Sequence, residues 1–408
     1  MKMFLSSTIV KIGGICLFLT ASFLIPSWGD EATSSENVIA VDSPAFSFSP
    51  ANWAMEADNG VRASWCPGAY FRVAWTTSST NPTADLLLDV SSYGAGFMPP
   101  LLAYCMDGIW VSNVPCADHI PIQNLKGSGP HLLTVFIESS QQAKRWGTEQ
   151  EKGVNQVRIK GLATDSLATS GSAPQATKWA WIVGDSITEG IQAGPHGDDN
   201  LACWSYFVGQ SLESLGYEYG VSACGYSGWL RPGDANGDVP AFYSVSGGQY
   251  DDHHSRWNKI NAQASLLDSD GKLSGYGKTG QEPSLVIINL GTNDGLNKVS
   301  GDDLRQSIAG GLNAIRAAAP HAKIFVLIPF GQFEADALQT AVKEANLHNS
   351  DLPSVSLIDL GDNVSRALTV SKFWGGLHPD MRGHANISAL ILAQILPELP
   401  KSPDEKSP

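Results

Sequence analysis

The sequence predicts two folded parts, an all-β sandwich of jelly-roll type followed by an α/β domain with helices on both faces of a parallel sheet. Three observations predict this. Short strand-like runs fill the first part, a stretch low in bulky residues follows, and strand-like and helix-like runs then alternate. We expect the sandwich at 36–168, a linker at 169–178, a three-layer α/β/α domain at 179–400 and a disordered tail at 401–408.

The sandwich is predicted by runs rich in Val, Ile, Phe, Trp and Tyr. They lie between clusters of Gly, Pro, Ser and Asn, and no long helical periodicity interrupts them. Short strands with such punctuation are typical of sandwiches and jelly rolls. The clearest runs are AYFRVAWTT, ADLLLDVSSY, GIWVSN, HLLTVFIESS and NQVRIKGLAT.

The parallel sheet is predicted by five apolar runs that alternate with helical patterns. The segment 231–282 interrupts the series after the second run and holds one weak helical pattern, at 255–267. Insertions beyond the carboxyl ends of strands usually form lids or binding loops, so we expect this one to shape the pocket. Strands are expected at 179–183, 217–223, 284–290, 323–329 and 355–360, and helices near 204–215, 302–318, 333–349 and 384–396.

The first 29 residues have the features of a secretory signal peptide. Lys2 and Lys11 precede an apolar run at 12–25, and Ser27 and Gly29 supply small residues at the expected cleavage site. We therefore expect an exported protein, periplasmic or extracellular, that has no membrane partner after cleavage. The alternative is an uncleaved anchor, although the run is shorter than the roughly 18 to 20 residues that span a bilayer.

The charge balance excludes partners that require a basic surface. The chain has 26 Lys and Arg against 40 Asp and Glu, a net charge of −14. Nucleic acids and anionic membranes bind basic patches instead. A neutral substrate is therefore expected.

The cysteines leave one disulfide open, and the adjacent histidines predict no metal site. Five of the six cysteines follow the signal, and this odd number leaves at least one unpaired. Cys105 and Cys116 flank a tight-turn sequence, so a short disulfide and buried free thiols are both open. His253 and His254 lack a usable ligand spacing and are interpreted as loop surface.

Four short motifs follow the predicted strands in order. WIVGDSITEG, at 181–190, ends the first strand on Gly-Asp-Ser, and CGYSGW, GTNDG and GGLHPDMRGH stand at 224–229, 291–295 and 375–384. In open α/β sheets the catalytic groups lie beyond the carboxyl ends of the strands, which makes Ser186 a candidate nucleophile. Together the motifs resemble the four blocks of the SGNH (GDSL-type) hydrolases.

The residue types in these motifs suit acyl transfer. An oxyanion hole could form from the backbone N–H groups of Ser186 and Gly228 and the side-chain amide of Asn293. Serine is a weak nucleophile, so an imidazole must take its proton and pass it to the leaving alcohol. The resemblance implies that His378, in a His-Pro pair before the last helix, is this base.

The chain departs from the family pattern at the third member of the triad. Relatives place an acid three residues before the histidine, where this chain has Gly375. Either a nearby backbone carbonyl orients the imidazole, which gives a Ser-His dyad and is the interpretation we prefer, or Asp359 or Asp362 does so. Asp185 is expected to be structural, and Asp380 to cap the last helix.

Tryptophans on or near the expected catalytic loops are candidates for substrate contact. Tryptophan faces suit sugar rings, although large aromatics are more often core residues. Trp229, beside the glycine of the second motif, and Trp374, just before the last motif, are the best placed; the others are Trp204 and Trp257. His384 is interpreted as a helix-start residue rather than a catalyst.

A β-sandwich, a linker and an SGNH domain resemble carbohydrate esterase family 2, which includes acetyl xylan esterases and members with a Ser-His dyad. The resemblance implies a secreted esterase that removes O-acetyl groups from polysaccharides or oligosaccharides through an acyl-enzyme, with no metal or organic cofactor. Two alternatives are a GDSL-type esterase or lipase for other or longer acyl esters, and a non-catalytic glycan-binding protein. The glycan and its hydroxyl position are not predicted.

Overall fold

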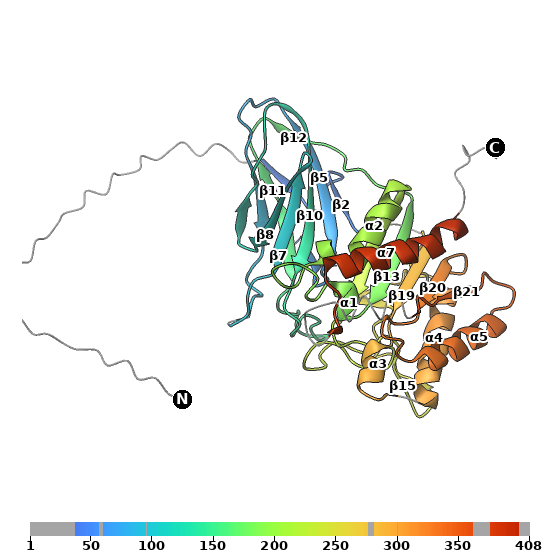
Figure 1. The fold of residues 1–408 in the computed structure, drawn as a ribbon. Coiled ribbons are helices and arrows are strands. Elements are labelled where there is room, and N and C mark those ends of the chain that lie inside the picture. The colour runs from blue at the N-terminus through green and yellow to red at the C-terminus, as the bar shows by residue number, and fades with distance from the viewer. Residues whose placement is uncertain are drawn as a thin grey trace, which may run out of the picture. The chain divides into compact units, whose positions relative to one another are not determined.

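The computed structural model describes residues 37–56, 60–94, 96–275, 281–299, 301–361 and 376–399. Figure 1 shows the arrangement of its elements. In these ranges, no helix has the length and apolar character needed to cross a membrane. The predicted signal peptide and the predicted tail lie outside the described residues.

Two antiparallel sheets form the first part of the described chain. Their strands are β1 (Asn37–Ala40), β2 (Phe46–Phe48), β3 (Ala54–Glu56), β4 (Val61–Ser64), β5 (Tyr70–Thr77), β6 (Ala84–Leu88), β7 (Leu101–Met106), β8 (Ile109–Pro115), β9 (His119–Pro121), β10 (Gly129–Ser139), β11 (Val157–Thr164) and β12 (Ala168–Ser170). One sheet has the order β3-β4-β11-β6-β9 and the other β12-β5-β10-β7-β8; β1 joins the first through β11, and β2 joins the second through β5. The predicted sandwich is confirmed.

Strand β10 shows how the sequence pattern places this sandwich. Leu133, Val135 and Ile137 alternate along the strand and are buried in the core between the two sheets. Phe136 points to the opposite face, where its ring lies 5.1 Å from the ring of Tyr70. Both faces of this sheet are therefore apolar here, because the second part of the chain covers the outer one.

The second part is built on a parallel sheet of five strands. They pair in the order β14-β13-β19-β20-β21, and every pairing is parallel. Each of the five predicted strands ends within two residues of the observed one. The strands are β13 (Lys178–Gly184), β14 (Tyr217–Ala223), β19 (Leu285–Asn289), β20 (Lys323–Leu327) and β21 (Val355–Ile358).

Helices cover both faces of this sheet (Figure 1), so the three-layer prediction is confirmed. The helices are α1 (Ser186–Glu189), η1 (Asn200–Ala202), α2 (Trp204–Ser214), α3 (Thr292–Leu296), α4 (Asp302–Ala318), α5 (Ala335–His348), α7 (Met381–Ile395) and η3 (Leu396–Glu398). Successive strand residues point to opposite faces. Ile182 and Ile287 therefore pack with α2 and α7, whereas Trp181 and Val286 pack with α4 and α5.

The long insertion contains hairpins where the sequence indicated a helix. The prediction of a helix at 255–267 is wrong: β17 (Lys259–Asn261) pairs with β18 (Ala264–Ser265), and β15 (Val245–Ser246) pairs with β16 (Gln249–Tyr250). The Asn261 side chain accepts the Gln263 N–H at 2.9 Å and closes a turn. The carbonyl of Ile260 accepts from the Trp65 indole at 2.6 Å, so a tertiary contact that no local pattern reveals holds this hairpin to the sandwich.

Buried polar contacts join the sandwich to the parallel sheet within one compact unit. Arg72 on β5 donates to Glu218 on β14 at 3.0 and 3.1 Å and also contacts Glu213 on α2. The Asn52 amide donates to the carbonyl of Val221 at 3.1 Å. The predicted domain boundaries stay predictions.

Replacing Ile287 with Ala should destabilise the chain by about 2–5 kcal/mol, because this side chain has no exposed surface and its loss leaves a cavity. Urea unfolding followed by tryptophan fluorescence measures the change. Leu347→Ala is the matched control, since Leu347 is 71% exposed on α5 and should cost less than about 0.5 kcal/mol. Equal losses in the two variants would contradict the core position of Ile287.

Candidate active site

Ser186 begins the short helix α1 directly after β13. Gly184 precedes it because a Cβ at that position would lie 1.9 Å from Oγ1 of Thr188. Asp185 caps the helix: its carboxylate accepts the N–H of Ile187 at 2.9 Å, the structural role predicted for it. The backbone therefore fixes Ser186 at the edge of the sheet, and its side chain is half-buried.

His378 lies between β21 and α7, with Nε2 2.9 Å from Oγ of Ser186. The helix that follows is capped as predicted, because the Asp380 carboxylate accepts the N–H of Gly383 at 2.8 Å. Burial lowers the pKa of His378 to about 4. Its imidazole is therefore neutral at pH 7 and can accept the Ser186 proton.

Of the two candidate orienting acids, Asp359 lies within the described residues and Asp362 does not. Asp359 is exposed beyond β21, where its carboxylate accepts from Gln332 at 3.0 Å and from the N–H of Gly361 at 2.7 Å. Its hydrogen bonds thus run to these groups rather than to the His378 ring. Asp362 and the substrate-contact candidate Trp374 lie outside the described residues.

Asn293 and Asp294 follow β19 on the short helix α3 and hold the neighbouring loop. The Asn293 amide donates to the carbonyl of Ser227 at 3.0 Å. The buried carboxylate of Asp294 accepts three consecutive backbone N–H groups, those of 229–231, at 2.8, 3.1 and 3.0 Å. Asp294 thereby fixes the loop after β14 against the end of β19.

Gly228 and Trp229 occupy other roles than those the sequence suggested. The Gly228 N–H donates to the carbonyl of Arg231 at 2.9 Å, and a Cβ there would lie 2.2 Å from Asp294. Position 228 therefore has to be a glycine, because a side chain there would clash with the Asp294 carboxylate. Trp229 has no exposed surface and donates to the carbonyl of Leu290 at 3.2 Å. The prediction that its face contacts substrate is wrong, because the ring lies in the core.

Sequence reasoning missed a buried charged cluster that includes Glu189, on the same short helix as Ser186. Arg145, from the segment after β10, contacts Glu189 on α1 and Asp234 in the loop after β14. All three side chains are buried. Glu189 stands inside the Gly-Asp-Ser motif and could have been questioned as a charged residue in a short buried helix, whereas Arg145 lies in a polar stretch that gives no signal.

Two further residues in segments that contact the end of β13, close to Ser186, were also missed. Arg256, from the insertion, is buried and donates to the carbonyl of Gly184 at 3.3 Å and to Oγ of Ser227 at 3.0 Å. Tyr226 has φ of 61°, unusual for a bulky residue, and is 50% exposed. It lies two residues after Cys224, whose N–H donates to the same Gly184 carbonyl at 3.1 Å. Tyr226 thus presents an exposed aromatic ring on the loop after β14.

The cysteines and histidines follow the simpler of their sequence interpretations. The five cysteines that follow the predicted signal are free thiols, so Cys105 and Cys116 form no disulfide. His253 and His254 are exposed and lie near carboxylates of Glu149 and Asp251. Among the residues that the structure describes, no group of three or more His, Cys, Asp or Glu could hold a metal ion.

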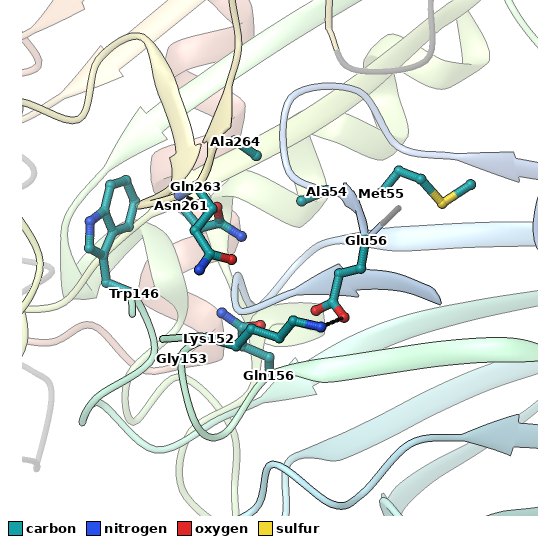
Figure 2. A pocket seen from close by; sticks show the side chains of 10 residues that line it. All are labelled: Ala54, Met55, Glu56, Trp146, Lys152, Gly153, Gln156, Asn261, Gln263 and Ala264. Carbon is teal, nitrogen blue, oxygen red and sulfur yellow. Dashed lines mark hydrogen bonds and ion pairs between the residues drawn. The ribbon is translucent and has the colours of Figure 1, made fainter. Parts of the chain in front are cut away.

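A cavity of about 150 Å³ lies apart from Ser186 and His378, between the sandwich and the insertion (Figure 2). Trp146 lines it beside Asn261 and Gln263 of the insertion, and Lys152 and Gln156 line it from another side. The amide of Gln156 donates to the backbone carbonyl of residue 145 at 2.8 Å. The wall of this cavity therefore also fixes the segment that carries the buried arginine.

Part of this chain matches a known protein family. The model of the GDSL-like lipase/acylhydrolase family matches residues 182–385, half of the chain. This span contains Ser186, Asn293 and His378. A comparison with the sequences of curated proteins finds no match.

Solved structures share the arrangement of a jelly-roll-like region and an α/β/α part. An acetyl xylan esterase (Est2A) from the rumen bacterium Butyrivibrio proteoclasticus has a TM-score of 0.62 at 15% identity, over 89% of this chain and 98% of that one. A family two carbohydrate esterase from Cellvibrio japonicus has 0.59 at 16%, over 88% and 97%. Salicylyl-acyltransferase SsfX3, from a tetracycline biosynthetic pathway, has 0.55 at 14%, over 89% and 98%. At these identities the likeness shows a common fold.

Ester cleavage should persist in acid, because the pKa of His378 lies near 4. Above that pH the imidazole is neutral and can take the Ser186 proton, so kcat/KM should hold from pH 7 to about 5 and fall about tenfold per pH unit below about 4. Initial rates on nitrophenyl acetate measure this profile, with tryptophan fluorescence as the control for folding. An acid limb near 6.5, where an exposed histidine titrates, would contradict the buried imidazole.

Proposed function

The chain belongs to the GDSL-like lipase/acylhydrolase family, and on that premise we propose that it is a serine esterase that removes O-acetyl groups from carbohydrates. The observation that carries the proposal is the 2.9 Å contact between Oγ of Ser186 and Nε2 of His378. A hydroxyl beside a neutral imidazole is the arrangement that generates an alkoxide nucleophile at neutral pH.

The proposed reaction has two steps. Ser186 attacks the acetyl carbonyl while His378 takes its proton, and the imidazolium then protonates the departing sugar hydroxyl as the carbon–oxygen bond breaks. In the second step His378 takes a proton from water, which attacks the acetyl-serine. Acetate leaves, and the proton returns to Ser186.

Two donors are proposed for the oxyanion. None of the described residues accepts a hydrogen bond from the Ser186 N–H, and Asn293 has one amide hydrogen bonded to the carbonyl of Ser227 and a second available. Both groups follow neighbouring strands of the sheet. Gly228 receives no donor role, because its N–H is already bonded to Arg231.

A carbohydrate substrate is supported by charge, by the shared fold and by one exposed ring. A net charge of −14 disfavours polyanionic substrates and leaves neutral glycans open. The structures of two carbohydrate esterases share the whole two-part arrangement. Tyr226 offers an aromatic surface of the kind that packs against sugar rings. Export, as the first 29 residues predict, would bring such an enzyme to extracellular polysaccharides.

The identity of the acyl group and of the acceptor is part of the proposal. SsfX3, which shares the fold, is an acyltransferase, so water as the acceptor has to be tested along with acetyl preference. Acetate release from acetylated xylan, with nitrophenyl acetate and nitrophenyl octanoate in parallel, does both. Release from xylan with little octanoate cleavage supports the proposal, and a preference for octanoate would replace it with a lipolytic function.

Ser186→Ala should reduce acetate release by about 10⁴-fold or more, because the nucleophile is lost while the backbone N–H remains. Ser211→Ala is the matched control, since its hydroxyl only contacts the carbonyl of Phe207 within α2. Retained activity in the Ser186 variant would contradict the assignment of Ser186 as the nucleophile.

Asn293→Ala should lower kcat by about 10²–10³-fold and leave KM little changed, since the amide would stabilise charge that develops only in the transition state. Circular dichroism and a thermal melt establish that the variant is folded. A rise in KM at constant kcat would show instead that Asn293 binds the ground state.

A further inference from the structure

We propose that Arg145 is a positioning residue. Through Glu189 it holds Ser186 and the loop after β14 in the relative positions in which Ser186 reacts. The inference rests on the proposed serine-esterase function and extends it into the sandwich part of the chain. Arg145 stands between β10 and β11, outside the residues matched by the family model. An active site at the sheet edge would thus require a side chain from the other part of the chain.

The guanidinium of Arg145 bridges α1, which begins with Ser186, and the loop after β14. Its Nη1 contacts the Glu189 carboxylate, three residues after Ser186 on α1. Its Nη2 donates to Oδ1 of Asp234 at 2.7 Å, and Asp234 donates its own N–H to the carbonyl of Gly225 at 2.7 Å. One planar group therefore fixes the distance between the nucleophile helix and the neighbouring loop.

Glu189 completes the link through its second oxygen. Oε2 accepts the N–H of Gly225 at 2.8 Å, at the start of the same loop, and the amide of Gln142 at 2.9 Å. Gly225 must be a glycine here, because a Cβ would lie 1.7 Å from Nε2 of Gln142. The Glu189 carboxylate thus joins α1, the loop after β14 and the segment after β10 at one point.

Because these charged groups are buried, each of them needs its partner. The side chains of Arg145, Glu189 and Asp234 have no exposed surface, so removal of one partner leaves a charge without compensation. Lysine cannot replace the arginine, since a point charge lacks the planar fork that donates to two carboxylates at once. A shift of about 1 Å at Ser186 is enough to cost about 10²-fold in rate.

Arg72 supplies the matched control. It is also a buried arginine of the sandwich, and it also joins two carboxylates of the second part, Glu218 and Glu213. Those lie at the beginning of β14 and near the end of α2, whereas the catalytic groups follow the strands' other ends. Arg72→Lys should therefore lower stability without a loss of reactivity, although one of its partners, Glu213, is 37% exposed and its effect on stability is smaller.

The test measures how fast Ser186 reacts, in the full chain and at a temperature at which all variants are folded. Arg145→Lys, Glu189→Gln and Arg72→Lys are compared with the unaltered chain. A fluorophosphonate probe forms a bond from phosphorus to Oγ of Ser186 and releases fluoride, and mass spectrometry of the Ser186 peptide gives the rate constant. Thermal melts, and kcat and KM on nitrophenyl acetate per labelled site, are measured in parallel.

We expect Arg145→Lys and Glu189→Gln to slow labelling and to lower kcat by about 10- to 100-fold with KM little changed. Arg72→Lys should label at the rate of the unaltered chain, even if its melting temperature falls. Equal labelling and kcat in the Arg145 and Arg72 variants would overturn the inference and leave the esterase proposal intact. No labelling of the unaltered chain would overturn both, because there would be no activated serine to position.

Discussion

The candidate active site depends on the parallel pairing of β14, β13 and β19. Parallel strands end at the same edge of a sheet, so the residues that follow these three strands meet there although they are far apart in sequence. Ser186 follows β13, the Gly225 loop follows β14, and Asn293 follows β19. His378 reaches the same edge from the segment before α7, where it meets the serine hydroxyl.

The edge of the sheet alone would leave these loops free to move, and buried polar groups fix them. Asp294 accepts three consecutive N–H groups from the loop after β14, which replaces the regular hydrogen bonds that a loop lacks. Arg256 reaches Gly184 from the insertion, and Arg145 reaches Glu189 from the sandwich. The sandwich therefore contributes a charged group to the buried surroundings of Ser186, besides its contacts with the edge strand β14.

The sequence predicted elements with strong periodicity and missed those set by tertiary contacts. The helix at 302–318 was predicted to the residue, because Leu304, Ile308, Leu312 and Ile315 recur at helical spacing and face the sheet. The pattern at 255–267 failed: the segment forms the β17–β18 hairpin, whose Ile260 carbonyl accepts from Trp65, almost two hundred residues earlier. Local patterns carry no information about such a partner.

Within the candidate active site too, local sequence patterns predicted some residues, and residues whose role is set by tertiary contacts were missed. The four motifs place Ser186 and His378, because each stands at a strand end or helix start that the apolar pattern reveals. Within the second motif, Gly228 was expected to donate to an oxyanion and Trp229 to contact substrate, yet Asp294 and the core account for these two residues. Arg145 could not have been found, since nothing in its own segment shows that it is buried.

In the proposed reaction, Ser186 carries the acyl group during turnover. The most direct measurement mixes the protein with an acetylated xylo-oligosaccharide, quenches in acid within the first turnovers and locates the acetyl group by peptide mass spectrometry. We expect acetyl on Ser186 in the unaltered chain and none in His378→Ala. Acetate release with Ser186 unmodified at every time point, or with acetyl on another side chain, would contradict the proposed reaction.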